Sequence, residues 1–293
     1  MKKILILFLF IPLFSCNDWL NVEPEDSVTF VNYFKSEEEL KALHNGIASY
    51  MKNICIGKQP YFYNALDADN IEWTYQGFWT LDPDTYLPDE SMVLDVNWSG
   101  FYDAIYMANV MIENEYRFEN ISEERAKFWL GQAHFCKAMS YFRIAQIWGD
   151  APIAKGSESI APEGKRPALE VLEEAIREAK LALTLPVYEE LKDVDGKQIT
   201  SKQYASLGTV NTLLANIYAW MGGLTQEEKY WTEAEFYASE VIERRAGAYD
   251  LESMDGLISK VFGKARSSVE TIFCIDNLSL IHISEPTRLR RIS

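Results

Sequence analysis

The chain has 293 residues, which is enough for one large domain or two ordinary ones. Its hydrophobic fraction of 48% and charged fraction of 25% are those of an ordinary globular protein. The formal net charge of −16 offers no basic footprint for a phosphate backbone, so nucleic acid is not an expected partner. Aromatic residues make up 13% of the chain, which indicates either a core rich in large rings or a stacking surface for a ligand.

The N-terminus has the features of a targeting segment. Lys2 and Lys3 precede an apolar run at 4–14, which at about eleven residues is too short for a membrane-spanning helix of about 20 residues. The run ends in Leu13-Phe14-Ser15-Cys16, which resembles the bacterial lipobox, in which the cysteine becomes the lipidated first residue. We therefore expect a lipoprotein signal peptide at 1–15, a lipidated Cys16 and a tether at 16–35. An ordinary secretory signal that happens to contain a cysteine is the alternative.

The first two predicted helices flank a long irregular stretch. Ser36 and Glu39 form a capping box, and it opens a helix whose apolar face carries Leu40, Leu43, Ile47 and Met51. Residues 57–98 are rich in Asp, Pro and aromatic residues and predict a long loop. A second helix is expected from Trp98 to about Tyr116, because a set of mainly apolar residues falls there at three- and four-residue spacing. These residues are Trp98, Tyr102, Ile105, Tyr106, Asn109 and Ile112.

The stretch 128–153 predicts the central helix of the protein. Apolar residues cover most of its circumference, which is typical of a helix packed on more than one side. Ser122 is the expected N-cap, and the helix should stop at Gly149, because Pro152 cannot continue it. A narrow polar stripe runs through Lys127, Gly131, His134, Lys137 and Ser140.

Three further helices follow in the pattern. Pro167 opens a helix at 168–185 whose apolar positions are Val171, Ala175, Ile176, Ala179 and Ala182. A helical pair is expected at 205–221 and 230–244, with Gly222 closing its first member and a capping-box candidate at 225–228. Residues 269–275 have strand character. Helix pairs with small residues at fixed offsets from tyrosine resemble tetratricopeptide repeats, although the connection is too long for a strict repeat. The predicted fold is all-α, a tetratricopeptide-like helical solenoid with long irregular loop insertions and at most short β elements.

Several of these segments resemble the SusD/RagB family of outer-membrane nutrient-binding lipoproteins. The tether carries Trp19, Leu20 and Pro24, and the second helix carries Trp98, Tyr102, Ile105, Ala108 and Asn109. The central helix carries Gly131, Ala133, Phe135, Ala138, Tyr141 and Phe142 and closes on Trp148, Gly149, Asp150 and Pro152. The resemblance covers residues 16–277 and implies a SusD-like helical domain at 36–277. The family normally continues beyond this point, so a truncated chain is expected. Residues 278–293 are basic and match nothing in the family, as an adapter-derived artefact or a disordered natural tail would.

The pattern offers little for catalysis, and no catalytic residue, cofactor or metal is expected. Of the three histidines, His44 and His134 fall on predicted helices and His282 falls in the tail, so they assemble no triad or metal cluster. The run 193–196 lacks the ligands of a calcium loop and predicts a tight turn. Cys55, Cys136 and Cys274 are interpreted as small buried hydrophobes without a disulfide.

The loop at 61–98 is the expected ligand contact. It places aromatic rings beside carboxylates and amides, and apolar sugar faces stack on rings while hydroxyl groups need acceptors. The candidate glycan-binding residues are Trp73, Tyr75, Phe78, Trp79, Tyr86, Asp67 and Asp69. The alternative is that these rings pin the loop onto the helices and that the acids cap the loop. A weak calcium site at these acids is a further alternative.

The family resemblance implies a binding protein rather than an enzyme. A member would be anchored by lipid in the bacterial outer membrane, exposed at the cell surface, and would pass oligosaccharides to a TonB-dependent SusC-like transporter. A peptide-binding RagB-like protein and a helical scaffold without a ligand are alternatives, and a glycoside hydrolase is the remote enzymatic one. Changing Trp73 or Trp79 to alanine would weaken ligand capture by a binding protein but would not affect a scaffold. Changing Asp67 or Asp69 to asparagine would abolish the activity of a hydrolase.

Overall fold

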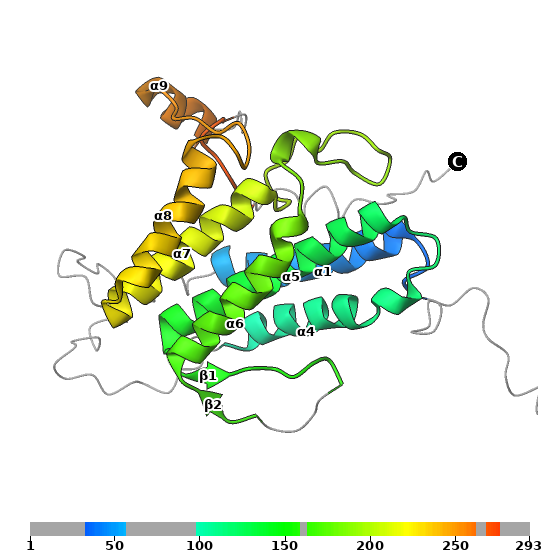
Figure 1. The fold of residues 1–293 in the computed structure, drawn as a ribbon. Coiled ribbons are helices and arrows are strands. Elements are labelled where there is room, and N and C mark those ends of the chain that lie inside the picture. The colour runs from blue at the N-terminus through cyan, green and yellow to red at the C-terminus, as the bar shows by residue number, and fades with distance from the viewer. Residues whose placement is uncertain (1–32, 57–97, 159–162, 262–267, 276–293) are drawn as a thin grey trace, which may run out of the picture. The chain divides into compact units, whose positions relative to one another are not determined.

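The protein is described from a computed structural model, which covers residues 33–56, 98–158, 163–261 and 268–275. The described residues from Phe34 onward belong to one compact unit. Within that unit the chain forms helices and a short strand pair (Figure 1). The predicted all-α helical-repeat class is therefore confirmed.

Helix α1 (Glu37–Ile56) begins at the predicted capping box. The backbone N–H of Ser36 donates to Glu39 Oε2 at 3.0 Å, and the backbone N–H of Glu39 donates to Ser36 Oγ at 3.4 Å. The predicted apolar face is buried throughout, namely Leu40, Leu43, Ile47 and Met51. Both the start of this helix and the face it buries follow from local sequence.

Helix α4 (Ser99–Glu113) is the predicted second helix, and a 3₁₀ turn at Glu115–Arg117 follows it. Its covered side differs from the predicted stripe, because Tyr106 is 52% exposed whereas Phe101 and Met111 are buried. The helix packs against both α1 and α5 (Glu123–Trp148). The positions of these two neighbours, rather than the spacing of the aromatic residues, decide which side of α4 is covered.

Helix α5 is the central helix, as predicted. Ser122 Oγ accepts a hydrogen bond from the backbone N–H of Arg125 at 3.3 Å, and the helix ends at Gly149, whose φ is 68°. It contacts α1 on one side, α4 on another and α6 (Ala168–Leu181) on a third. Because α5 is surrounded, even members of its polar stripe such as Lys137 and Ser140 are buried.

The chain returns from α5 to α6 through two short strands. β1 (Ala151–Pro152) and β2 (Lys165–Arg166) pair antiparallel. The carboxylate of Asp150 accepts a hydrogen bond from the backbone N–H of Ala168 at 2.9 Å and so satisfies a donor of the first turn of α6. The last residues of the predicted helix, Ala182–Thr184, form a 3₁₀ turn rather than an α-helix. The predicted apolar face is buried and consists of Val171, Ala175, Ile176, Ala179 and Ala182.

The run Asp193–Gly196 is a turn, as predicted. The backbone N–H of Gly196 donates to the carbonyl of Asp193 at 3.0 Å. Asp193 Oδ1 accepts from the backbone N–H groups of Asp195 and Lys197, so this carboxylate is used by its own turn. In the described ranges no group of three or more His, Cys, Asp or Glu side chains is arranged to hold a metal ion.

Helices α7 (Leu207–Thr225) and α8 (Glu228–Ile242) form the predicted pair, but the junction between them was predicted wrongly. Helix α7 runs through Gly222 and stops at Gln226, whose φ is 59°. Thr225 Oγ1 donates to the carbonyl of Met221, so it belongs to the last turn of α7 and does not cap α8. A capping box does exist at the other end of α7, between Ser206 and Thr209.

The last described segment corrects a second prediction. After α9 (Met254–Gly256) and a π-helical turn at Leu257–Val261, residues 268–275 run without forming a strand. One backbone hydrogen bond, from the N–H of Cys274 to the carbonyl of Lys202, joins this segment to the loop before α7. Cys274 is partly exposed, unlike the buried residue that was expected, whereas Cys136 is buried. The side chain of Cys55 lies outside the described residues.

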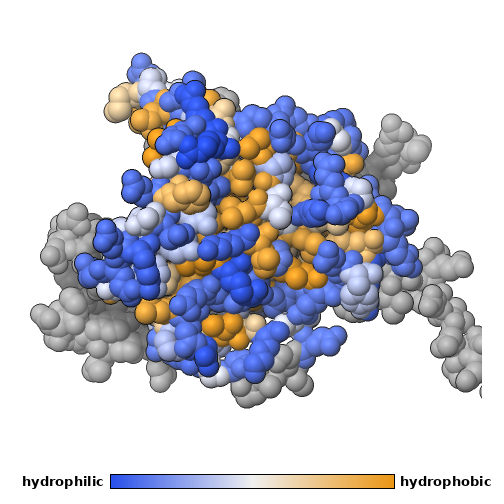
Figure 2. Space-filling model, in the orientation of Figure 1, coloured by the Kyte–Doolittle hydropathy of each residue, from blue (hydrophilic) through white to orange (hydrophobic). Residues whose placement is uncertain are grey.

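The helices pack as successive pairs. The most extensive contacts in the described part of the chain join α5 to α6 and α7 to α8, and α6 also contacts α7. Apolar residues gather near the centre of the face seen in Figure 2, where α6 and α7 meet in Figure 1, with hydrophilic residues around them. Within the described residues, no helix combines the length and apolar character that crossing a membrane requires.

Candidate functional site

The residues predicted from the sequence to bind a glycan lie outside the described residues, as does Cys16. The binding residues concerned are Trp73, Tyr75, Phe78, Trp79, Tyr86, Asp67 and Asp69. Their roles therefore remain predictions. The described part of the chain adds a cavity that the sequence did not predict.

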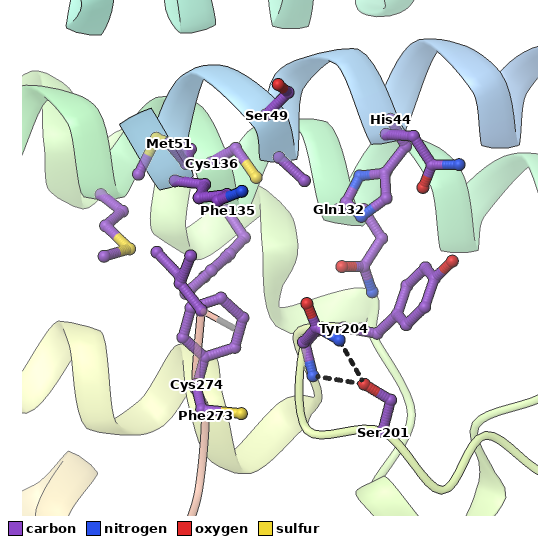
Figure 3. A pocket seen from close by; sticks show the side chains of 16 residues that line it. His44, Ser49, Met51, Gln132, Phe135, Cys136, Ser201, Tyr204, Phe273 and Cys274 are labelled. Atoms are coloured by element: carbon purple, nitrogen blue, oxygen red, sulfur yellow. Dashed lines mark hydrogen bonds between the residues drawn. The ribbon is translucent and has the colours of Figure 1, made fainter. Parts of the chain in front are cut away.

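This cavity has a volume of about 190 Å³ and lies between α1, α5, the loop 201–204 and the segment 273–275 (Figure 3). Its walls are mainly apolar, and its two ends differ in chemistry. One end is formed by His44, Gln132 and Tyr204, and the other by Phe135, Cys136 and Phe273. A space of this size holds a small molecule or one large side chain.

A buried imidazole stands at the polar end. His44 is 4% exposed, and its ring stacks on Tyr204 with centroids 5.2 Å apart and packs against Trp129 at 5.7 Å. Figure 3 shows the ring pointing from α1 toward Gln132. Nδ1 of His44 is buried without a hydrogen-bond partner among the described residues. Burial lowers the pKa of His44 to about 4, so the ring is neutral at physiological pH.

Gln132 on α5 holds in place the loop 201–204, which forms one wall of the cavity. Its Nε2 donates to the carbonyl of Ala205 at 2.8 Å, and its Oε1 accepts from the backbone N–H of the same residue at 2.9 Å. Gln132 is fully buried, and this paired bond satisfies backbone groups that no helix or strand satisfies. The amide is therefore a positioning group for Tyr204 and offers little to a ligand.

The apolar end is built by two aromatic rings from distant parts of the chain. Phe135 and Phe273 meet edge to face with centroids 5.1 Å apart. Cys136 lies beside them, and burial raises the pKa of its thiol to about 12. A thiol that stays protonated is a poor nucleophile, so this end of the cavity is suited to packing rather than to covalent chemistry.

A second polar cluster lies at the interface of α5 and α6. Glu178 is 1% exposed, and its carboxylate is bound by His134 Nδ1 at 2.5 Å and by Lys137 Nζ at 2.9 Å. Burial alone would raise the pKa of Glu178, but the hydrogen bond from His134 and the charge of Lys137 hold it at about 2. A carboxylate held so firmly in its ionised form does not exchange protons near neutral pH. The cluster joins α5 to α6 through a buried charge network.

Sequence reasoning missed the cavity for a reason that the contacts make clear. A signal for the burial of His44 was present, because it lies on α1 at helical spacing from Leu40 and Ile47, but this signal did not enter the prediction. Its neighbour Tyr204 comes from a loop far along the chain, and Phe273 comes from a segment without helical periodicity. No local pattern reports that these residues meet.

A sequence-family profile described as starch-binding and associating with the outer membrane, SusD-like, matches residues 18–221. The chain belongs to this SusD-like family. The matched range includes residues 61–98, so the predicted glycan-binding residues fall inside the family region. It also includes α1, α4, α5 and α6 and most of α7.

Individual SusD-like relatives agree with this assignment. One SusD-like protein of Formosa agariphila is 25% identical over 159 residues, which are 51% of this chain and 30% of the relative. A second SusD-like protein of the same organism is 26% identical over 242 residues, or 80% of this chain and 45% of the relative. The chain thus spans less than half the length of these curated relatives.

The fold is shared with solved SusD structures. A SusD homologue of Bacteroides thetaiotaomicron superposes with a TM-score of 0.68 at 22% identity, over 85% of this chain and 55% of the homologue. A SusD superfamily protein of the same organism gives the same TM-score at 20% identity, over 81% of this chain and 55% of that protein. The helical arrangement around α5 is therefore that of the SusD-like fold.

Proposed function

We propose that this chain is a cell-surface binding protein that captures oligosaccharides and delivers them to a TonB-dependent SusC-like transporter of the outer membrane. The observation that carries the proposal is the match of residues 18–221 to a family described as starch-binding and associating with the outer membrane. We assign it no catalytic role.

In this proposal the N-terminus supplies the membrane anchor. Residues 1–15 are removed as a signal peptide, Cys16 is lipidated, and residues 16–35 tether the helical domain at 36–277. Each buried methylene of an acyl chain contributes about 0.8 kcal/mol to membrane binding, so several chains on one cysteine give a stable anchor. Replacing Cys16 with serine in a bacterial host should abolish metabolic labelling with a palmitate analogue and release the protein from the membrane fraction.

The ligand site in this proposal is the loop that contains Trp73 and Trp79. Aromatic rings there stack on the sugar, and Asp67 and Asp69 accept hydrogen bonds from its hydroxyl groups, with Tyr75, Phe78 and Tyr86 as further rings. Calorimetric titration with neutral oligosaccharides tests the idea. Trp73→Ala and Trp79→Ala should each weaken binding, whereas Trp231→Ala, an exposed tryptophan on α8, should leave it unchanged.

The same titration separates the alternatives. Binding of peptides but of no oligosaccharide would favour a RagB-like peptide carrier. Binding of neither, together with normal folding, would favour a scaffold. The transporter is tested separately, by asking whether a TonB-dependent transporter co-purifies with the Cys16-anchored protein from outer membranes and is lost with the Cys16→Ser variant.

A further inference from the structure

A second hollow of the described surface lies between the C-terminal parts of α5 and α7. Its volume of about 360 Å³ is at the lower end of the range for small-ligand sites, and it is open to solvent. The residues that line it are Phe142, Gln146, Asn216, Ala219, Trp220, Gly223 and Leu224. It shares Phe142 and Asn216 with a neighbouring hollow of about 480 Å³, so the two are continuous along α5.

A tryptophan forms one wall of this hollow. Trp220 is 41% exposed, and its indole lies edge to face with the ring of Phe142 at a centroid distance of 6.5 Å. Burying an indole would normally be favourable, so an exposed ring supported by a buried one leaves an apolar platform in solvent. Gly223 has no atom within 4 Å of the place where a Cβ would stand, so space remains open beside the platform.

Two amide side chains flank the platform, and each already makes one hydrogen bond within the protein. Gln146 Oε1 accepts a hydrogen bond from Arg143 Nη1 at 2.9 Å, and Asn216 Nδ2 donates to the carbonyl of Thr212 at 2.8 Å. These internal bonds orient both amides. Within the described part of the chain, Gln146 Nε2 is left as a donor and Asn216 Oδ1 as an acceptor. A ring with one donor and one acceptor beside it is what a sugar needs, since its faces are apolar and its edge carries hydroxyl groups.

The charge of the hollow restricts the ligand further. Among the described residues that line the hollow at Trp220, none carries a charged side chain, and the neighbouring hollow adds one cation, Arg143, and one anion, Glu270. The whole chain carries a net charge of −16, which disfavours polyanionic ligands. The chemistry therefore fits a neutral ligand with alternating apolar faces and hydroxyl groups.

We propose that this hollow is an additional subsite for a neutral oligosaccharide, with Trp220 as the stacking platform and Gln146 and Asn216 as hydrogen-bonding partners. The inference rests on the proposed glycan-capture function. It assigns a subsite on α5 and α7, far in sequence from the loop that carries Trp73 and Trp79.

The test follows Trp220 directly in the full chain. The protein is labelled with 5-fluorotryptophan, the ¹⁹F resonance of Trp220 is assigned with Trp220→Phe, and maltoheptaose is added as a neutral probe. We expect the Trp220 resonance to shift with saturation, and Trp220→Ala to weaken the affinity of this subsite about threefold to tenfold. Trp231 is the matched control, because it is 47% exposed on α8 and does not line the hollow. Its resonance should stay in place.

A second variant protects the test against misfolding. Asn216→Leu removes the acceptor but keeps the platform, and should reduce the saturable shift of Trp220 while leaving the helical circular dichroism unchanged. The double variant Trp73→Ala/Trp79→Ala should still show the Trp220 shift.

Three outcomes would overturn the subsite. If the sugar binds but moves only resonances outside Trp220, the glycan-capture function stands and this inference fails. If the Trp220 resonance moves with protein concentration and not with sugar, the hollow is covered by a second copy of the chain. If the wild-type protein binds no oligosaccharide at all, both the function and the subsite are wrong.

Discussion

Glu178 on α6 accepts a hydrogen bond from Nδ1 of His134 on α5 at 2.5 Å, inside an interface that leaves the carboxylate 1% exposed. Lys137 and Arg177 also reach this carboxylate, so three cationic or potentially cationic groups converge on one acid. A buried charge with this many partners is costly to disturb on one side only. The cluster therefore ties the two helices of the first pair together.

Replacing Glu178 should therefore lower the stability of the folded protein. In Glu178→Gln the ammonium of Lys137 stays buried without a counter-charge, and we expect the free energy of unfolding to fall by about 3 kcal/mol in urea titrations. Glu170→Gln on the same helix is the matched control, since the side chain of Glu170 is 40% exposed and pairs with Arg166, which is 58% exposed. Its cost should stay below about 1 kcal/mol. Equal losses for the two variants would mean that burial does not set the strength of this cluster.

The stability of the protein should fall as the pH drops below neutrality, because of His44. The folded protein keeps this ring neutral down to a pKa of about 4, whereas the unfolded chain takes up its proton near 6.5. The unfolded state binds more protons between these values, so the free energy of unfolding should fall by about 3 kcal/mol as the pH falls from 6.5 to 4. Urea titrations at half-unit pH intervals measure the slope.

His44→Phe is the control for this slope. The substitution keeps an aromatic ring against Tyr204 and Trp129 and removes the titration, so the variant should be flatter between pH 6.5 and 4. Glu178 acts in a lower window, because its folded pKa of about 2 lies below the ordinary value of 4.5. Its contribution is lost as the pH falls from 4.5 through 2. Identical slopes in wild type and His44→Phe above pH 4.5 would contradict the assignment.

Even the small substitution Gly131→Ala on α5 should destabilise the folded protein. A Cβ at this position would lie 2.8 Å from both Cγ and Cδ2 of Leu185, which is 2% exposed and has little room to move. We expect Gly131→Ala to lower the free energy of unfolding by about 1–3 kcal/mol, although alanine favours helices. Gly223→Ala on α7 meets no atom within 4 Å and should stabilise the protein by about 0.5–1 kcal/mol. Thermal melts of both variants measure these effects. A Gly131→Ala variant more stable than the wild type would show that the side chain of Leu185 moves to make room for the new methyl group.

The start of α7 should depend on Ser206. Its Oγ accepts from the backbone N–H of Thr209 at 3.4 Å and lies 2.9 Å from the hydroxyl of Tyr249, so one atom serves the helix cap and a buried contact. Ser206→Ala should cost about 1–2 kcal/mol in urea titrations. Thr225→Ala is the contrasting variant, because Thr225 does not cap α8, and its cost should lie within about 0.5 kcal/mol. A larger loss of stability for Thr225→Ala than for Ser206→Ala would contradict the assignment of Ser206 as a helix cap and of Thr225 as a residue that does not cap α8.

The sequence alone determined the helices and most of their ends, because these features depend on residues close together in the chain. The box at Ser36 and Glu39, the cap at Ser122 and the stop at Gly149 are each local, and all three are present in the structure. The apolar faces of α1 and α6 were also local, since each recurs at helical spacing. The family could be recognised for the same reason, from short motifs in a fixed order.

Tertiary structure decided which side of α4 is covered, where α7 ends and how the cavities are lined. Tyr106 fits the apolar stripe of α4 and is still exposed, because α1 and α5 lie on another side. Residues 269–275 have the composition of a strand, but their backbone hydrogen bonds go to scattered partners. The carbonyl of Val269 accepts from the N–H of Asp250 and the N–H of Cys274 donates to the carbonyl of Lys202, so the segment forms no strand. His44, Tyr204 and Phe273 come together only after the chain has folded, because burial and contact depend on neighbours that sequence spacing does not record.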